Sequence, residues 1–202
     1  MSEFFPRTVA TDRLRLERLT LDAVDVFDLY AICSSDPGID EVTEYVTWDP
    51  HETVKETRDW LVESEKRWDA GEAAEYVVRP REGEDGAGEI AGATILGVDW
   101  ERDVGELGVW LRRRFWGRGY SGERAAALLA VAFDRLDLSM VAVSHLDGNE
   151  KSRRAVERYV EAHGGRYEGH LRRSRETADG TVVDEHRYTI LRAEYRASRA
   201  ET

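Results

Sequence analysis

The 202-residue sequence predicts a mixed α/β fold of the α+β type, built on a largely antiparallel sheet. Three strand-like runs, 74–79, 89–100 and 103–112, follow one another at hairpin-like spacing, which is typical of an antiparallel meander. The stretch 125–136 carries a wide apolar stripe at helical spacing and predicts an amphipathic helix. Taken with the flanking patterns, these runs predict a sheet of about seven strands covered by about four helices.

The first half of the chain begins with a strand and a helix. Leu14 and Leu16 alternate with charged residues and start a period-two strand, and residues 21–32 carry apolar side chains at helical spacing. An irregular segment, 36–50, separates them from a helix over about 52–69 that ends at Gly71. The three strands of the meander follow this helix.

The second half adds a buried strand, a helix and a terminal hairpin. The apolar run 140–143 is typical of a strand buried on both faces. Asn149 is placed to cap a helix that runs to about residue 163. Runs 167–173 and 182–195 predict a hairpin around Asp179 and Gly180. Because no repeat or linker divides the chain, we expect a single domain over 1–202.

Composition restricts the class of protein. The longest apolar stretch, 125–133, is far shorter than the ~20 residues of a membrane-spanning helix. The N-terminus has no apolar segment behind a basic start, so we expect a cytoplasmic protein that contacts no membrane. Cys33 is the single cysteine, and the five histidines lack metal-ligand spacing, so we expect neither a disulfide nor a metal site.

The charge balance is strongly acidic, with a net charge of −12. This balance disfavours nucleic-acid binding. Only three of the 29 basic residues are lysines. An acidic, lysine-poor surface of this kind resembles that of halophilic proteins, in which salt screens the repulsion between the negative charges. A GC-rich genome that favours arginine codons, or a surface that attracts a cationic substrate, would give a similar composition.

A basic, glycine-punctuated loop between a strand and a helix is the densest chemical signal. Gly117, Gly119 and Gly122 allow the main chain to approach an anion closely. Main-chain amides at a helix start, helped by the helix dipole, can bind phosphate oxygens. Five arginines concentrate positive charge there: Arg112, Arg113, Arg114, Arg118 and Arg124. A pyrophosphate is therefore the expected ligand. The alternative interpretation is that these residues form a structural turn that binds no phosphate.

The glycines also spell the G-x-G-x-x-G of dinucleotide-binding folds, with Asp147 in the place of a ribose-binding acid. Three features disfavour that interpretation. The motif follows about 115 residues of other structure, the preceding strand alternates instead of being uniformly apolar, and only 55 residues follow Asp147. A doubly wound sheet has too little room in this chain.

The loop and its surroundings resemble the GNAT N-acetyltransferases, specifically their RimJ/RimL-type branch. Residues 114–119 (RFWGRG) match the acetyl-CoA signature (Q/R)-x-x-G-x-(G/A) of that superfamily. The branch-specific elements are the E-L-G at 106–108, the pairs Trp-Gly at 116–117 and Gly-Tyr at 119–120, Glu123, and the N-x-x-S formed by Asn149 and Ser152. Outside this core, residues 11–16 resemble the opening strand of the family. The branch usually has Gly-Phe where this chain has Gly-Gly at 164–165.

The resemblance implies an acetyl-CoA-dependent N-acetyltransferase with the corresponding fold. It implies that the acetyl donor contacts these residues: Val109, Trp110, Leu111, Arg114, Trp116, Gly117, Arg118, Gly119, Tyr120, Ser121, Asn149 and Ser152. It places the acceptor amine near Tyr45, Trp48 and Glu106. Main-chain N–H groups near Val109 and Trp110 would contact the thioester oxygen.

Glu106 is the candidate general base, because it alternates onto the face opposite Leu107 and its neighbours. Alternatively, its carboxylate binds a cationic substrate or a nearby arginine. Ser152 and Tyr159 are the two candidates for the group that serves the leaving thiolate. Cys33 ends an apolar helical stripe, which favours a buried structural thiol over a nucleophile and therefore favours direct transfer in a ternary complex.

The ease of deprotonation favours an α-amine as the acceptor. Freeing a lysine amine at pH 7 costs about 4.6 kcal/mol, whereas an α-amine costs about 1.1 kcal/mol. The expected acceptor is a protein or peptide N-terminus, such as that of a ribosomal protein. An amino acid or polyamine acceptor, a catalytically silent acyl-CoA-binding module and a homodimer all stay open at this level.

Overall fold

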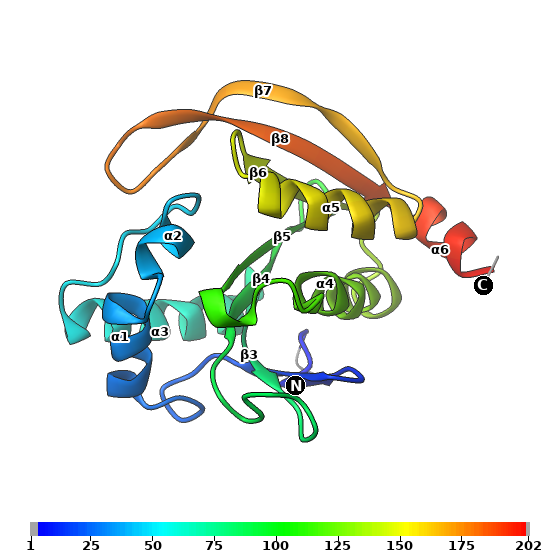
Figure 1. Cartoon of the computed structure of the whole chain (residues 1–202). Helices are drawn as coiled ribbons and strands as arrows, with labels where there is room; N and C mark the ends of the chain where they lie inside the picture. Colours follow the sequence, from blue (N-terminus) through cyan, green and yellow to red (C-terminus); the bar gives the residue numbers. More distant parts are fainter. Residues whose placement is uncertain (1–3, 201–202) are drawn as a thin grey trace.

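The computed structural model describes residues 4–200 and forms one mixed sheet flanked by helices on both faces (Figure 1). Within this range the sheet has eight strands in the order β1-β2-β3-β4-β5-β6-β8-β7. Their bounds are β1 Thr8–Ala10, β2 Leu14–Arg18, β3 Ala73–Pro80, β4 Gly92–Asp99, β5 Val104–Leu111, β6 Met140–Leu146, β7 Arg166–Glu176 and β8 Val182–Leu191. Every neighbouring pair is antiparallel except β5 and β6, which are parallel.

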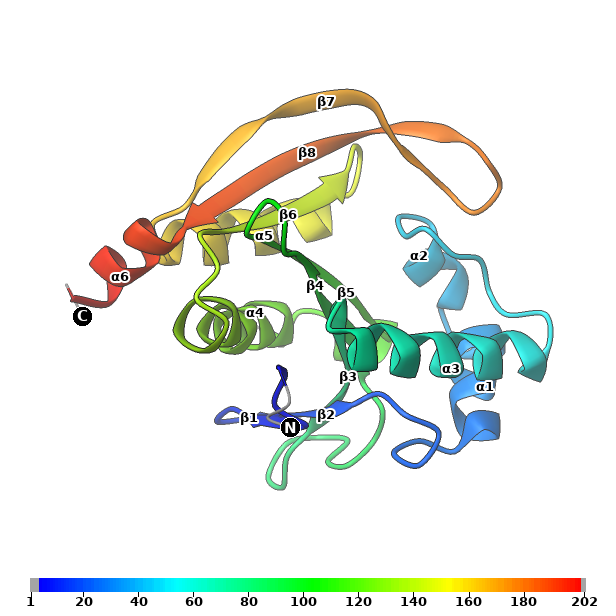
Figure 2. The same cartoon turned by 180° about the vertical axis from the view of Figure 1, so that it is seen from behind.

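Two groups of helices enclose the sheet. Their bounds are α1 Val26–Ser35, α2 Ile39–Thr43, α3 Val54–Ala70, α4 Tyr120–Ala130, α5 Glu150–Ala162 and α6 Arg192–Ala200. Helices α1 to α3 form one hydrophobic core with one face of the sheet, while α4 and α5 form a second core with the opposite face. Hairpin β7–β8 continues beyond β6 as a long arm whose tip extends toward the side of α2 (Figures 1 and 2).

The predicted α/β fold with its antiparallel meander is confirmed, and several boundaries and counts differ. The first helix begins at Val26 because Asp25 caps it by accepting the N–H groups of Phe27 and Asp28. Residues 192–195 start helix α6 instead of continuing the last strand, since Glu194 accepts the N–H of Leu191 at the turn. Strand β1 and helices α2 and α6 are the elements that the sequence-based prediction of about seven strands and about four helices did not include.

Strands β5 and β6 pair over only part of their lengths. The parallel register runs from Val104 opposite Met140 to Leu107 opposite Val143. Both strands continue past this point, to Leu111 and Leu146, but they no longer pair with each other. The two strands therefore separate at the middle of the sheet and leave a gap between them. Among residues 4–200 no helix is long and apolar enough to cross a membrane.

Glu123, in the first turn of α4, connects this helix to the start of β2. Its carboxylate accepts hydrogen bonds from Thr11 Oγ1 (2.5 Å) and from the main-chain N–H (2.8 Å) and Nε (2.8 Å) of Arg13. Burial acts to raise the pKa of Glu123, but these hydrogen bonds outweigh it and lower the pKa. The charged carboxylate thus holds the N-terminus of α4 against the sheet.

Glu123→Gln is expected to lower the free energy of unfolding at pH 7 by about 1.5–3 kcal/mol, the usual loss for charged hydrogen bonds. Because the folded state lowers the pKa, the stabilisation is present above the ordinary glutamate pKa of about 4.3 and is lost as pH falls through the folded value. Urea unfolding at pH 7 and at progressively lower pH measures this. The matched control is Glu82→Gln at an exposed position. An equal loss at every pH would contradict the assigned role of the charge.

Candidate active site

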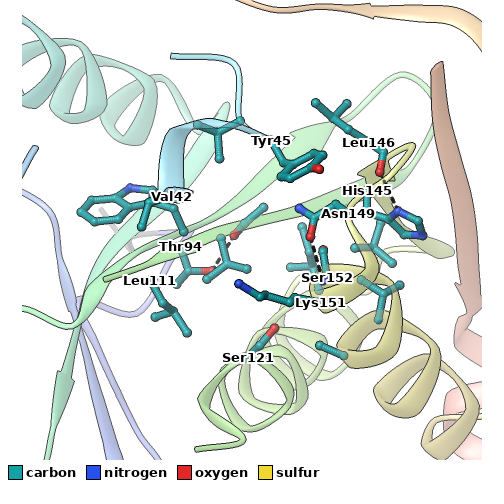
Figure 3. A pocket seen from close by; sticks show the side chains of 18 of the residues that line it. Val42, Tyr45, Thr94, Leu111, Ser121, His145, Leu146, Asn149, Lys151 and Ser152 are labelled. Atoms are coloured by element: carbon teal, nitrogen blue, oxygen red, sulfur yellow. Dashed lines mark hydrogen bonds between the residues drawn. The ribbon is translucent and has the colours of Figure 1, made fainter. Parts of the chain in front are cut away.

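A cleft of about 1420 Å³ runs from the glycine loop, past the gap between β5 and β6, to the segment around α2. Its lining combines both faces of the sheet (Figure 3). It contains all the predicted site residues except Arg114 and Arg118. We call the part formed by the glycine loop, α4 and α5 the donor half, and the part formed by residues 41–60 and the opposite face of β5 the acceptor half.

The glycine loop presents free main-chain donors to the donor half. Gly117 and Gly119 have φ angles of +76° and +80°, in the left-handed region that favours glycine, and no atom lies within 4 Å of the position that a Cβ would take on Gly117. Within residues 4–200 the main-chain N–H groups of residues 117–121 have no hydrogen-bond acceptor. Open space, free N–H groups and the N-terminus of α4 together form a site suited to phosphate oxygens.

The arginines of the loop are neutralised by carboxylates instead of facing the cleft. Four of the five predicted cationic residues form ion pairs: Arg112 with Asp36 (2.5 Å), Arg113 with Glu41 (3.1 Å), Arg114 with Glu89 (2.7 Å) and Arg118 with Asp85 (2.7 Å). The guanidinium groups of Arg114 and Arg118 also lie over the ring of Phe115. Their side chains thus stabilise the loop from outside, and the main chain is left as the anion-binding element.

The gap between the strands exposes main-chain donors of β5. The N–H of Arg112 donates to Ala91 O across the β4–β5 ladder (2.8 Å). Alternation in an antiparallel ladder then directs the N–H of Trp110 toward β4 and those of Val109 and Leu111 toward β6. Since β6 no longer pairs there, these two N–H groups face the gap. The N–H groups of Val109 and Leu111 thus face the gap, whereas that of Trp110, also expected there, is directed toward β4.

Glu106 lies in β5 on the acceptor face, as its alternation predicts, and 53% of its side chain is exposed. Its carboxylate pairs with Arg175 of β7 (3.1 Å), and the same guanidinium pairs with Glu185 of β8 (3.1 Å). Both carboxylates line the cleft. The arm formed by β7 and β8 thus supplies a cation to the place where an acceptor amine would approach.

Helix α5 brings Ser152 and Tyr159, the two candidates for the group that serves the leaving thiolate, to the donor half. Asn149 caps the helix, its Oδ1 accepting the N–H of Ser152 (3.0 Å; Figure 3). The Ser152 hydroxyl has no hydrogen-bond partner in the described part of the chain. Tyr159 is buried two turns further along, and its hydroxyl also lacks a partner there. Burial raises the pKa of Tyr159, and the charge of Arg124 acts in the opposite direction.

Two predicted donor-side aromatic residues have structural contacts of their own. Trp116 donates its indole N–H to Leu111 O (2.7 Å), and Lys151 Nζ lies 4.2 Å from the centroid of its ring. Tyr120 is buried and its hydroxyl donates to Glu84 (2.7 Å). These contacts hold the loop in place at the mouth of the donor half.

The acceptor half has an aromatic wall. Tyr45 and Trp48 line it as predicted, and Tyr45 lies near the start of α5 (Figure 3). The Trp48 ring is 5.4 Å from that of Trp110, and the Trp60 ring is 6.4 Å from Trp110. Trp60 donates its indole N–H to the buried carboxylate of Glu75 (3.1 Å). Of the predicted substrate residues, Trp48 thus belongs to a larger surface of three indoles.

Several lining residues could not be assigned from the sequence: Thr94, Trp60, Glu75, Arg175 and Glu185. They reach the cleft from five different elements, α3, β3, β4, β7 and β8, which only the tertiary fold brings together. A cross-strand row of His145, His186 and His170 also forms, with stacked rings 4.9 and 4.8 Å apart. Among residues 4–200, no group of His, Cys, Asp or Glu could hold a metal ion.

Comparisons with known proteins agree with this geometry. The family model described as "Acetyltransferase (GNAT) domain" matches residues 13–159. The uncharacterised N-acetyltransferase p20 of Bacillus licheniformis is 27% identical over 188 residues, covering 93% of this chain and 98% of p20.

Solved structures share the fold. A GCN5-related N-acetyltransferase from Brucella melitensis superposes with a TM-score of 0.75 at 23% identity, over 97% of this chain and 86% of that one. RimL, described as a ribosomal L7/L12 alpha-N-protein acetyltransferase, superposes with a TM-score of 0.74 at 17% identity, over 91% of this chain and 93% of that one.

Cys33 is expected to be inert toward thiol reagents in the folded protein. It is fully buried, and burial, with a contribution from Asp36, raises its pKa to about 12. The thiolate fraction at neutral pH should therefore be roughly a thousandfold below that of an unperturbed thiol. Labelling rates measured in native buffer and in urea test this; comparable rates would show that the thiol is accessible and reactive.

Proposed function

Because the chain belongs to the GNAT acetyltransferase family and resembles its RimJ/RimL-type branch, we propose that it acetylates the α-amine of a protein or peptide N-terminus. The enzyme is an acetyl-CoA-dependent N-acetyltransferase, since this family uses acetyl-CoA as the acetyl donor. The observation that carries the proposal is the continuous cleft from the free amides of residues 117–121 to the carboxylate of Glu106.

The donor half fits acetyl-CoA. The free N–H groups of residues 117–121 suit the diphosphate, and the side-chain hydroxyls of Ser121 and Ser152 and the amide of Asn149 offer polar contacts further along the cleft. The N–H groups of Val109 and Leu111 suit the thioester oxygen. These groups line one continuous cleft at different places along it, so an extended ligand could meet all of them.

Direct transfer accounts for the arrangement of the site. The lone pair of the neutral amine attacks the thioester carbon, a C–N bond forms, and the C–S bond breaks with its electron pair remaining on sulfur. Main-chain N–H groups from Val109 and Leu111 would stabilise the oxyanion, one such donor typically contributing ~3 to 4 kcal/mol. Glu106 would take the amine proton directly or through water. Cys33 is buried and has a raised pKa, which argues against a covalent acyl-cysteine intermediate.

The acceptor half favours an amine on a cationic or partly apolar partner. Glu106 and Glu185 supply negative charge, and the indoles of Trp48, Trp60 and Trp110 supply apolar surface beside it. An α-amine costs less free energy to deprotonate than a lysine amine. The structural neighbour RimL is described as an alpha-N-protein acetyltransferase of ribosomal L7/L12. A small amino acid or polyamine acceptor would use the same carboxylates, and a catalytically silent acyl-CoA-binding module is the remaining alternative.

Isothermal titration of the protein with acetyl-CoA, in a salt concentration that keeps it folded, should show one binding event. Gly119→Glu should weaken binding by at least about a hundredfold, or about 2.8 kcal/mol, because the left-handed φ would be strained and negative charge would be added at the N-terminus of α4, where the diphosphate is expected to bind. The control is Gly83→Glu, which has a similar φ (+98°) in open space outside the cleft. Absence of binding to the unaltered protein would refute the assigned donor half.

The acceptor is tested by thiol release with two peptides of one sequence containing an internal lysine, one with a free and one with a blocked N-terminus. The free peptide should be acetylated at least about tenfold faster at pH 7, since its α-amine is neutral more often than the lysine amine. The difference between the acetylation rates of the two peptides should become smaller as pH rises, because the lysine amine then also becomes neutral.

Glu106→Gln provides the catalytic control for this assay. It should lower kcat by about 10²–10⁴ while leaving acetyl-CoA affinity unchanged if Glu106 is the base. Preference for amino acids or polyamines over both peptides would reassign the acceptor. Binding of acetyl-CoA without thiol release from any amine would identify a silent module.

A further inference from the structure

Arg124 is a buried cation without a carboxylate partner. It lies one turn into α4, lines the cleft, and only 1% of the residue is exposed. Its Nη1 lies 3.4 Å from Thr94 Oγ1, and its Nε has no hydrogen-bond partner within residues 4–200. No ion pair with an acidic side chain forms in that range. The four other arginines of the loop region each have an acidic partner, so Arg124 alone carries uncompensated charge there.

A second unsatisfied polar group lies beside this guanidinium. The Tyr159 ring is 5.7 Å from Arg124 Cζ, and its buried hydroxyl has no hydrogen-bond partner in the described residues. Thr94 does not neutralise the cation, since its uncharged hydroxyl accepts one hydrogen bond from Arg124 and donates to Gly108 O (2.7 Å). Two buried donor groups from different helices, the Arg124 Nε–H and the Tyr159 hydroxyl, therefore lie beside one part of the cleft without an acceptor in residues 4–200.

Burying an unpaired charge is strongly unfavourable unless a partner arrives. Burial lowers the pKa of Arg124, yet a guanidinium keeps its proton under all ordinary conditions in proteins. The charge of Arg124 therefore persists, and an anionic group entering the cleft would compensate it. The same buried position keeps the guanidinium from pairing with anions in bulk solvent.

The position of Arg124 identifies which part of the donor it would meet. Thr94, which contacts Arg124, lies directly opposite Val109 in the β4–β5 register. Val109 presents the N–H that faces the gap between β5 and β6. Arg124 and Tyr159 thus lie in the donor half at the level of the thioester, away from the diphosphate site at residues 117–121.

We propose that Arg124 and Tyr159 form a cationic site that binds the sulfur of CoA as a thiolate. This inference rests on the proposed function. When the C–S bond breaks, the electron pair stays on sulfur and is stabilised by the guanidinium and by a hydrogen bond from the Tyr159 hydroxyl. The amine proton leaves toward Glu106 or water, so that no acid need protonate the sulfur within the site. Arg124 then shares with Tyr159 the role of serving the leaving thiolate, for which Ser152 was the other candidate.

Other ionisable groups facing the cleft do not offset this site. Glu106 and Glu185 share Arg175 in the acceptor half. From α5, Lys151 lies over the Trp116 ring at the mouth, and Arg154 and Arg158 line the cleft as exposed cations whose charge is screened by solvent. His145 of β6 has a pKa lowered by burial. Tyr159 is the ionisable group in contact with Arg124. The pH dependence of sulfur binding should therefore report mainly on Arg124.

The test is an ultraviolet titration of CoA bound to the protein over a range of pH, with the acetyl-CoA complex as the blank for tyrosine absorbance. A free thiol ionises near pH 8.5, and a neighbouring cation lowers this value. We expect the bound thiol to ionise at least about one pH unit lower than free CoA. Arg124→Met should abolish this lowering of the thiol pKa, and Arg124→Lys should retain part of it. The control is Arg199→Met, which removes an exposed ion pair with Asp134 and should leave the thiol pKa unchanged.

Binding of CoA and of desulfo-CoA separates this proposal from the alternatives. The proposal expects Arg124→Met to weaken CoA binding while leaving desulfo-CoA binding unchanged. Equal weakening of both ligands would place Arg124 on the pantetheine amides and overturn the proposal. CoA bound as the neutral thiol by the unaltered protein would overturn it without any variant, even if the variants fail to fold. Failure to bind either ligand would instead refute the proposed function.

Discussion

The early end of pairing between β5 and β6 is the constraint on which the site depends. A parallel pair that continued past Leu107 and Val143 would use the N–H groups of Val109 and Leu111 within the sheet. Because β6 diverges, these donors remain free inside the protein, where unsatisfied main-chain groups are rare. The cost is tolerable because the gap is open to the cleft, and a ligand can satisfy what the sheet leaves unpaired.

Charge is distributed differently from what the basic loop suggests. Guanidinium groups from Arg112, Arg113, Arg114 and Arg118 are all bound by carboxylates. Their positive charge therefore fixes the loop against the β3–β4 turn and the first helices, while neutral N–H dipoles face the cleft. Arg124 differs because it lies inside the molecule, where no carboxylate accompanies it. A locally basic sequence thus produces one buried cation and a largely neutral loop.

The sequence predicted those features that depend on local pattern. Alternation placed Glu106 on the correct face, the Asn149 cap began α5, and Gly117 and Gly119 adopt the left-handed φ that their loop requires. It could not show features that depend on which elements meet. The N–H of Leu111, and not that of Trp110, faces the gap because hydrogen-bond direction follows strand neighbours. Arg175 reaches Glu106 only because β7 extends past β6.

The Glu106–Arg175 contact affects how an acceptor can enter. An acceptor amine that uses Glu106 must compete with a guanidinium already paired to it, and that guanidinium is also held by the buried carboxylate of Glu185. Glu185 can retain Arg175 after Glu106 turns to the amine, so the exchange need not leave a buried charge unpaired. The two carboxylates around one arginine therefore allow Glu106 to change partners, whereas a simple Glu106–Arg175 pair would oppose binding of the amine.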